Sequence, residues 1–445
     1  MKIIEDIALA QSTLLRRSTG EAVDLPPQVR ERIRKVFGQE MSADEVVARI
    51  IADVRARGDE ALRDYARRLD GAAIERFEVP RDEIIAARDG VERNLRESLE
   101  FVAQRIADFH RRQRDLLPTG RVMLGKGVGE EISALERVGV YAPGGTASYP
   151  STVLMTAIPA RAAGVKEIIL ATPPRADGRI PALTLAAAGI AGVDRVFALG
   201  GAPAIAALAY GTRSIPRVDK ICGPGNIFVM LAKKHVFGVV DIDGLQGPTE
   251  TIVLGDASAD PVSCAADLLA QAEHDEMATA ILITPSKELA HRVSIEVDRQ
   301  LKGLERRAIA EKSLEQRGGI VITGNLEEAV ALVNAYAPEH LCLLVANPES
   351  VIPQIRHSGG IFVGETSPEV LGDYAAGPSH VMPTGGTARF SSPLNVLDFL
   401  KVKSIVSLDE RAFRELSRHA AAIARAEGLT AHARAAEIRL KPGGA

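Results

Sequence analysis

The segment LLAQAEHDE, at residues 268–276, ends a helical pattern with a glutamine and a histidine three residues apart. Side chains at this spacing share one face of a helix, so the amide oxygen of Gln271 and the imidazole of His274 can converge on one cation. The same pair is also common at solvated helix ends. A metal site therefore requires further ligands from other parts of the chain.

Two other segments offer such ligands. Asp373 lies in LGDYAAG, where small neighbours permit close approach, and His432 lies in GLTAH, where Thr430 is a candidate cap for a final helix. His380, close to Asp373, fits a hydrogen-bonded structural histidine equally well. Each of these signals is weak when taken alone.

Glu339 and His340 are adjacent in YAPEHL, directly before the apolar run LCLLV of a predicted strand. Such a pair can act as two general bases aimed at different atoms, or as one base supported by the other. A loop whose polar side chains face water explains the pair equally well. The residues alone leave both interpretations open.

Three glycine-rich segments each follow a predicted strand. They are YAPGGTASYPS, LGGAPAIA and CGPGNIF, at residues 141–151, 199–206 and 222–228. Turns of this kind let the backbone approach a phosphate while the next helix supplies N–H groups, so three along one sheet edge indicate a nucleotide crevice. None contains the complete GxGxxG pattern, and each one is compatible with ordinary turn formation.

Composition narrows the class of partner. The chain has 445 residues, which predicts more than one domain, and its formal net charge of -4 gives no basic field for nucleic acid or an anionic membrane. Glu5 and Asp6 interrupt the first residues before an apolar signal region forms. The cysteines at 222, 264 and 342 lie far apart in apolar contexts, which indicates buried thiols. We expect a cytoplasmic protein that acts on a small molecule.

Two series of β-branched runs alternate with helical segments. The first comprises RVGVY, KEIILAT, DRVFALG and VDKIC, and the second TIVLGD, ATAILIT, GGIVITG and GGIFVG. This alternation predicts an α/β protein with two similar, incomplete Rossmann-like units built on parallel sheets. Helical patterns before residue 115, including a capping box at Ser42 and Glu45, and again after Ser407, predict helical N-terminal and C-terminal segments. Thr387 to Pro393 is the best linker candidate.

The helix that ends near Gln271 has a clear predicted start. Asp260 is expected at the N-cap and Pro261 at the first helical position. Its predicted buried stripe consists of Val262, Ala266 and Leu269.

The chain resembles the histidinol dehydrogenase family over nearly its whole length. The motifs that carry the resemblance are ERVGVYAPGG, PSTVLM, VDKICGPGN, LLAQAEHD, YAPEHL, GDYAAGPSHVMPT, GTARFSSPL and LTAH. The resemblance implies a zinc-dependent, four-electron oxidation of L-histidinol to L-histidine through histidinal with two NAD, the last steps of histidine biosynthesis. It also implies a homodimer with shared active sites and one zinc ion per subunit.

The resemblance also implies roles for individual residues. Glu339 and His340 match the paired catalytic bases. The positions that match zinc ligands are Gln271, His274, Asp373 and His432. Those that match substrate contacts are Thr249, Gln271, His274, His340, Asp373, Glu427 and His432. Those that match NAD contacts are Tyr141, Pro203 and Asn226.

On this basis the chain is expected to divide into four parts. They are a helical arm at 1–36, a first α/β domain on the substrate and zinc side at 37–137 and 250–386, a second α/β domain on the NAD side at 138–249, and a helical tail at 387–445. The tail is expected to reach the partner subunit, where Glu427 and His432 would complete the neighbour's site.

Two positions depart from the usual family pattern. Pro203 stands where glutamine is usual and lacks both an amide side chain and a backbone N–H, whereas Thr249 stands for serine and keeps the hydroxyl. The nearest alternative function is a paralogous NAD-dependent dehydrogenase of another polar primary alcohol, such as a sulfonated diol. A zinc lyase or hydrolase and a non-catalytic metal-binding module are the more distant alternatives.

Overall fold

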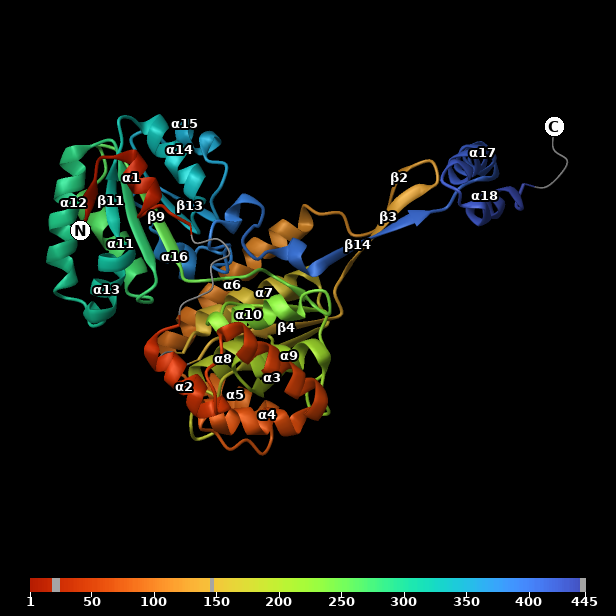
Figure 1. Cartoon of the computed structure of the whole chain (residues 1–445), viewed down its shortest axis with the longest axis horizontal. Coiled ribbons are helices and arrows are strands. Elements are labelled where there is room, and N and C mark those ends of the chain that lie inside the picture. The colour runs from red at the N-terminus through yellow and green to blue at the C-terminus, as the bar shows by residue number, and fades with distance from the viewer. Residues whose placement is uncertain (18–24, 145–147, 441–445) are drawn as a thin grey trace. The chain divides into compact units, whose positions relative to one another are not determined.

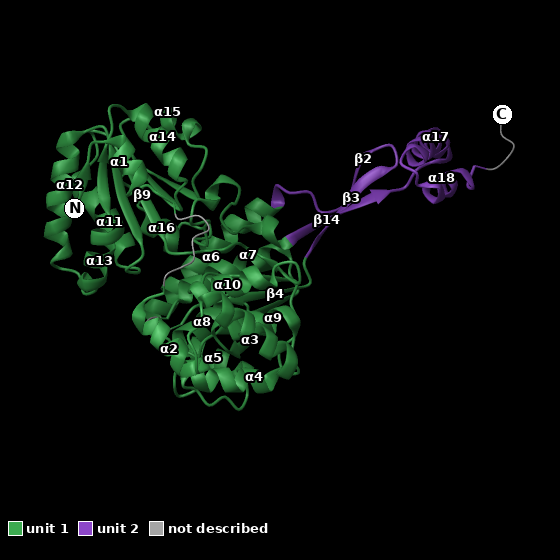
Figure 2. Ribbon diagram, viewed as in Figure 1, with its two compact units in different colours: residues 1–114, 135–399 green, residues 115–134, 400–445 purple. Residues whose placement is uncertain are grey.

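The computed structural model describes residues 1–17, 25–144 and 148–440. The chain forms two compact units, shown in Figure 2. Unit 1 comprises Met1–Arg114 and Leu135–Phe399, and unit 2 comprises Asp115–Ala134 and Leu400–Ala445.

One parallel sheet of unit 1 has the strand order β6-β5-β4-β7-β8. Its strands are β4 (Arg137–Tyr141), β5 (Glu167–Thr172), β6 (Arg195–Ala198), β7 (Lys220–Cys222) and β8 (Asp241–Ile242). The connecting helices are α7 (Pro150–Ala163), α8 (Ala182–Ile190), α9 (Gly201–Tyr210) and α10 (Ile227–Val236). The chain order reverses its direction between β4 and β7, so the carboxyl ends of these two strands form a switch point of the kind that binds ligands.

The other parallel sheet of unit 1 has the order β1-β11-β10-β9-β12-β13. Its strands are β1 (Ile3–Ile4), β9 (Glu250–Gly255), β10 (Thr279–Thr284), β11 (Gly319–Ile322), β12 (His340–Leu344) and β13 (Gly360–Val363). Its helices are α1 (Ile7–Ser12), α11 (Pro261–Ala272), α12 (Lys287–Leu301), α13 (Arg307–Arg317), α14 (Leu326–Tyr336), α15 (Pro348–Val351) and α16 (Glu369–Tyr374), as Figure 1 shows. The predicted α/β class with parallel sheets is confirmed, whereas β1 makes the first residues part of a sheet instead of a purely helical arm.

Several helices before residue 115 pack on a different sheet from the one that the predicted domain boundaries assigned to them. They are α2 (Pro27–Phe37), α3 (Ala43–Arg57), α4 (Asp59–Tyr65), α5 (Arg81–Asp89) and α6 (Arg93–Asp115). The capping box of Ser42 and Glu45 is present. However, α3 contacts α9 and α10, and α5 contacts α8, so this part of 37–137 packs on the β4–β8 layer and not on the β9–β13 layer. An apolar helix face shows that a helix is covered, but it does not show which sheet covers it.

Unit 2 contains an antiparallel sheet that the sequence did not predict. The strands β2 (Gly120–Gly125), β3 (Val128–Ala134) and β14 (Leu400–Val406) have the order β14-β3-β2 and are followed by α17 (Glu410–Ala426) and α18 (Thr430–Glu437). The predicted helical tail at 387–445 therefore begins with short 3-10 turns and a strand. The predicted linker from Thr387 lies inside unit 1, and Thr430 is the first helical residue of α18 and not its cap.

The cysteines at 222, 264 and 342 are free and buried, as predicted. Among the described residues, no helix has both the length and the apolar character needed to cross a membrane.

Candidate functional site

Helix α11 places Gln271, the glutamine of the LLAQAEHDE segment, inside the protein. Asp260 caps the helix by accepting from the N–H groups of Val262 and Ser263, and Pro261 occupies the first turn, as predicted. The predicted buried stripe is wrong for Val262 and Ala266, which are exposed. The buried face instead includes Cys264, Ala265, Leu268 and Leu269. Gln271 lies on this buried face and is fully buried. His274 lies beyond the end of the helix and is exposed.

Glu339 and His340 meet the amino end of strand β9. The Oε2 atom of Glu339 lies 2.6 Å from Thr249 Oγ1 and accepts from the Glu250 N–H at 3.0 Å. The Nδ1 atom of His340 lies 3.3 Å from the Glu250 carbonyl oxygen. Both candidate bases are buried. The backbone of β9 therefore fixes both side chains of the adjacent pair.

The other ring nitrogen of His340 connects β12 to α16. Nε2 lies 3.1 Å from Asp373 Oδ1, and the ring stacks on Phe362 with 5.7 Å between centroids. His380 donates from Nδ1 to the Asp373 carbonyl at 2.8 Å, which fits the predicted structural alternative for this histidine. Asp373 is thus held at its backbone and at its carboxylate.

Glu369 is a site residue that the sequence did not reveal. It is buried, and its Oε2 accepts from Thr251 Oγ1 at 2.6 Å. The amide orientation of Gln271 is assigned from its neighbours, because only one orientation lets its NH2 group donate to Glu369 Oε1, at 3.1 Å. The Gln271 oxygen accepts from the Glu250 N–H at 2.8 Å, and the amide also lies 2.6 Å from Thr249 Oγ1. The available signal was the spacing of Glu369 and Asp373, four residues apart on one helical face.

Burial and crowding of carboxylates perturb the acid–base groups of this site. Burial raises the pKa of Glu339 to about 7, against the opposing effect of His340. Burial likewise raises the pKa of Glu369 to about 7. For His340, burial lowers the pKa, but Glu339, Glu369 and the hydrogen bond to Asp373 together raise it well above its ordinary value. The site therefore favours a protonated His340 beside a Glu339 that can exchange its proton near neutral pH.

His274 and Asp373 have the ionisation states of metal ligands. Partial desolvation lowers the pKa of His274 and so favours its neutral imidazole, although Asp373 opposes this effect. Burial would raise the pKa of Asp373, but the hydrogen bond and charge of His340 hold it below its ordinary value, so the carboxylate is ionised. Neutral imidazole and carboxylate are zinc ligands.

The complete predicted ligand set is not brought together. Across residues 1–17, 25–144 and 148–440, no three His, Cys, Asp or Glu side chains form a group that could hold a metal ion. Gln271 supplies an amide oxygen that already accepts hydrogen bonds from β9. His432 and Glu427 belong to unit 2, where both are exposed.

The candidate NAD residues lie at the carboxyl edge of the β4–β8 sheet. The buried Tyr141 ends β4, and its hydroxyl accepts from the N–H of Gly201 at 3.0 Å. Pro203 is buried in the first turn of α9, where its missing N–H costs no helical hydrogen bond. Asn226 is the exposed N-cap of α10 and accepts from two backbone N–H groups. The predicted glycine segments follow β4, β6 and β7 at this edge, and residues 145–147 of the first segment lie outside the described residues.

Close packing explains why glycine is required in two of these turns. A Cβ atom at Gly200 would lie 2.6 Å from Pro173 Cβ. Gly223 has a φ of +114°, and a Cβ atom there would lie 2.1 Å from the Tyr141 carbonyl oxygen. Gly223 allows the ends of β4 and β7 to approach each other at the switch point, and Gly200 allows the turn after β6 to approach the turn after β5.

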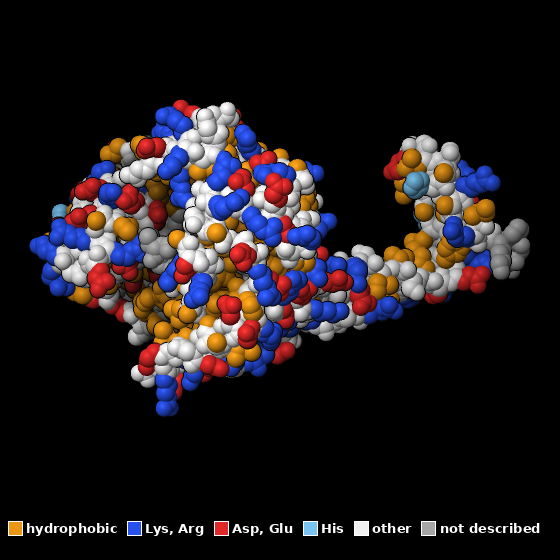
Figure 3. Space-filling view, turned by 90° about the horizontal axis from the view of Figure 1, so that it is seen from below, with side chains coloured by type: hydrophobic (Ala, Val, Ile, Leu, Met, Phe, Trp, Pro, Cys, Tyr) orange, Lys and Arg blue, Asp and Glu red, His pale blue; other side chains and the backbone are white. Residues whose placement is uncertain are grey.

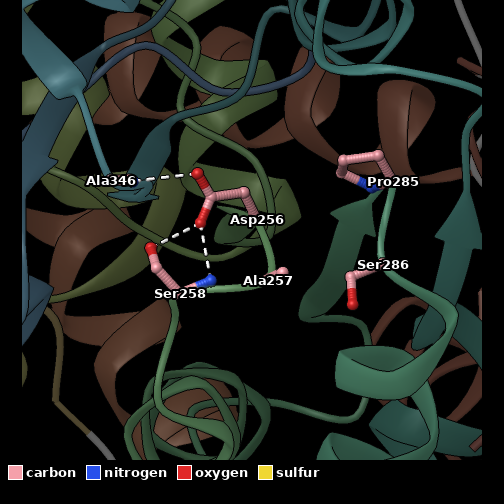
Figure 4. Close-up of a pocket in the computed structure, with 6 residues that line it drawn as sticks. All are labelled: Asp256, Ala257, Ser258, Pro285, Ser286 and Ala346. Atoms are coloured by element: carbon pink, nitrogen blue, oxygen red, sulfur yellow. Dashed lines mark hydrogen bonds between the residues drawn. The ribbon is translucent and has the colours of Figure 1, made fainter.

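A pocket of about 490 Å³ lies at the opposite edge of the β9–β13 sheet from Glu339 and His340. Figure 4 shows Asp256 in this pocket with its carboxylate bound to the backbone and hydroxyl of Ser258 and to the backbone of Ala346. The other lining residues are Ala257, Pro285 and Ser286. Asp256 thus stabilises the turn, and no predicted site residue lines the pocket.

Comparisons of the sequence and of the structure with known proteins identify the same family over nearly the whole chain. The sequence model of the family described as histidinol dehydrogenase matches residues 34–440. A histidinol dehydrogenase of Dehalococcoides mccartyi is 53% identical over 99% of this chain and 100% of its own length, and one from Deinococcus radiodurans is 49% identical over 98% of this chain and 99% of its own. A solved histidinol dehydrogenase from Elizabethkingia anophelis matches with a TM-score of 0.88 and 33% identity, covering 99% of this chain and 98% of that one.

Proposed function

The chain belongs to the histidinol dehydrogenase family, and from this membership we propose how its own residues perform the reaction. It is an NAD-dependent oxidoreductase of histidine biosynthesis that oxidises L-histidinol to L-histidine through histidinal. NAD accepts a hydride in each of the two oxidations, and water supplies the second oxygen of the product carboxylate. The observation that carries the proposal is the convergence of Glu339, His340 and Asp373 at the amino ends of β9 and β12.

We propose that the two bases serve different steps. His340 removes the hydroxyl proton of the alcohol, and Glu339 activates the water that hydrates the aldehyde. The elevated pKa of Glu339, about 7, supports a group that takes and returns a proton near neutral pH. Thr249 lies at hydrogen-bonding distance from Glu339 and keeps the hydroxyl that the family's usual serine supplies.

His340 must lose a proton before it can act as a base. Three carboxylates, those of Glu339, Glu369 and Asp373, favour its protonated form. Engagement of Asp373 by a cation and a cationic substrate would weaken this preference. The proposed metal and the proposed base are therefore coupled through the 3.1 Å contact between Asp373 and His340.

We propose one zinc ion per subunit, held by His274 and Asp373 together with Gln271 and the partner's copy of His432. When bound, zinc would supply a Lewis acid that holds the substrate and polarises its reacting oxygen. The neutral His274 and ionised Asp373 support this set. Gln271 would have to exchange hydrogen bonds that its oxygen now makes with β9.

Metal content tests the zinc proposal independently of activity. After exhaustive chelation, the protein is titrated with zinc and bound metal is counted for the unmodified chain, His274→Ala and Asp373→Asn. We expect one zinc per subunit in the unmodified chain and at least tenfold weaker binding in both variants. An exposed histidine outside the site, His291→Ala on α12, is the control. Equal zinc binding by all four proteins would refute the ligand set.

For NAD we propose the edge formed by the ends of β4, β6 and β7. The amino ends of α9 and of α10, which Asn226 caps, lie at this edge, and the positive ends of their helix dipoles favour a pyrophosphate there. The NH2 group of the exposed Asn226 remains able to donate to the cofactor. Pro203 is proposed to lie next to the cofactor and to contact it without a hydrogen bond, because it has neither a backbone N–H nor an amide side chain.

We also propose a cytoplasmic homodimer. Unit 2 buries few of its own apolar side chains, since α17 and α18 have only Ser417, Ala421 and Ala433 buried. Figure 3 shows hydrophobic side chains on its surface. The exposed ones include Val402, Val406, Leu416, Ile423, Leu429 and Ile438. A second copy of the chain would cover such a surface, and it would bring Glu427 and His432 to the neighbour's site.

Product stoichiometry tests the reaction. With limiting L-histidinol and excess NAD, we expect two NADH and one L-histidine per histidinol consumed. A sulfonated diol serves as the comparison substrate. Efficient NADH formation from the diol and none from histidinol would favour a paralogous dehydrogenase and would overturn the proposed substrate.

A further inference from the structure

The turn that carries Glu339 and His340 begins at a strained residue. Ala337 is, within the described ranges, the only non-glycine residue with positive φ, at φ 54° and ψ 67°. A side chain in this left-handed region is unfavourable unless surrounding contacts fix it. Ala337 is also the C-cap of α14, one residue before Pro338 and two before Glu339.

Two arginines hold the end of α14. Arg17 donates through Nε and an Nη atom to the Tyr336 carbonyl at 3.0 and 2.6 Å, and through the same Nη to the Ala337 carbonyl at 3.1 Å. Arg389 donates to the carbonyls of Asn334 and Ala335 at 2.9 and 2.6 Å. The last helical carbonyls, which have no partner within the helix, thus receive cationic donors at the negative end of the helix dipole.

Arg17 also binds the start of strand β9, which contacts both Glu339 and His340. Its other Nη atom forms an ion pair with the buried carboxylate of Glu250. The Glu250 backbone contacts Glu339 and His340. The guanidinium lies 3.5 Å from the centre of the Tyr336 ring, and the Arg17 side chain is only 19% exposed. One planar cation therefore links the start of β9 to the end of α14, the helix that precedes Glu339 and His340 in the chain.

We propose that Arg17 is a positioning residue for the reaction: it fixes the left-handed turn at Ala337 and the start of β9, and thereby sets the distance between Glu339, His340 and the substrate. Arg389 supports the same helix end. This inference rests on the proposed roles of Glu339 and His340, because Arg17 touches neither side chain.

The test is single-turnover NADH formation by Arg17→Met with saturating NAD and with enzyme in excess over histidinol, at a concentration that saturates histidinol binding. Under these conditions the rate constant reports each active molecule, so a smaller folded fraction does not lower it. We expect both NADH phases to slow on the order of 10–100-fold, with an unchanged KM for NAD. Arg17→Lys keeps the charge but loses the fork that spans two carbonyls, so it should show an intermediate rate. Arg299→Met, at an exposed pair with Glu296 on α12, is the matched control and should react normally.

A second-site variant tests the mechanism of the effect. Glycine adopts the left-handed conformation readily, so Ala337→Gly added to Arg17→Met should recover part of the lost rate. Normal rate constants in Arg17→Met and Arg17→Lys would overturn the proposal, as would a slowed Arg17→Met that Ala337→Gly does not improve. Glu339→Gln is measured in parallel: if it reacts normally the assignment of the bases is wrong, whereas a slow Glu339→Gln with a normal Arg17→Met removes only the positioning role.

Discussion

Glu339 and His340 differ in what surrounds each proton-accepting group. Glu339 accepts hydrogen bonds through Oε2 from the start of β9, and His340 offers one nitrogen to β9 and the other to Asp373. Both oxidations need a proton acceptor, but only the second needs an activated water. Neighbouring residues with different partners can therefore divide the two steps.

We predict that Glu339→Gln separates the two oxidations. The amide keeps the shape and the acceptor oxygen for Thr249 and Glu250 but is not a base. In a single turnover with excess NAD, the first NADH should form at nearly the normal rate and the second should slow on the order of 10²- to 10⁴-fold.

His340→Asn is the complementary variant and should slow the first NADH, because no base then assists loss of the hydroxyl proton. Equal slowing of both phases by Glu339→Gln would contradict this division, as would an unaffected first phase in His340→Asn.

Pro203 is a second residue whose effect can be tested, in this case its effect on NAD binding. Its ring occupies the first turn of α9, where glutamine is usual in the family, and a glutamine there would restore an N–H group and an amide side chain. We predict that Pro203→Gln lowers the KM for NAD several-fold. Pro203→Ala restores the N–H alone and separates the two effects. An unchanged or higher KM in Pro203→Gln would mean that the missing amide has no consequence here.

At the scale of an element, α11 carries an acidic side chain on its buried face. Burial raises the pKa of Asp267 from 3.8 to about 6, and it lies one turn before Gln271. A carboxyl whose folded pKa is raised contributes most to stability below its unfolded pKa, and this contribution is lost as the pH rises through the folded value. The ionised Asp267 therefore destabilises the fold at alkaline pH.

We predict that Asp267→Asn stabilises the protein at pH 8 by about 1–2 kcal/mol relative to its effect at pH 4. Thermal or urea unfolding at both pH values measures this difference. Asp256, whose pKa is lowered by hydrogen bonds that outweigh its burial, is a contrasting carboxylate on the same sheet, and Asp256→Asn should lose stability at pH 8. A pH-independent effect of Asp267→Asn would show that burial does not control this carboxyl.

At the scale of the whole molecule, the division into units separates the predicted ligands. Gln271, His274 and Asp373 belong to unit 1, and His432 belongs to unit 2. A site assembled from two subunits would use unit 1 of one chain and unit 2 of the other.

Complementation of inactive chains tests this arrangement. We predict that His274→Ala and His432→Ala chains are each inactive and that their co-expression produces mixed dimers with one intact site and part of the normal activity. The control is two differently tagged His274→Ala chains, which should remain inactive. Purified mixed dimers of the two different variants that show no activity would place His432 in the site of its own chain.

Much of the architecture follows from local sequence. Strands of a parallel sheet are covered on both faces, so RVGVY, EIILAT and AILIT are continuous apolar runs, and their alternation with helices determines the α/β class. Caps involve residues only a few positions apart, which is why Asp260 and the box of Ser42 and Glu45 were predictable. The adjacency of Glu339 and His340 is likewise a property of the chain itself.

The tertiary structure decided everything that depends on contacts between distant segments. Glu369 belongs to the site because it binds Thr251, and Arg17 because it binds Tyr336 and Glu250. These partners are so far apart in the sequence that no periodic pattern connects them. His110 precedes two arginines in the chain but is fully buried. Strand β14 pairs with β3, which is far away in the chain. Local patterns show which residues prefer burial or a turn, but the partner that satisfies each group depends on long-range packing, and this packing exists only in the folded chain.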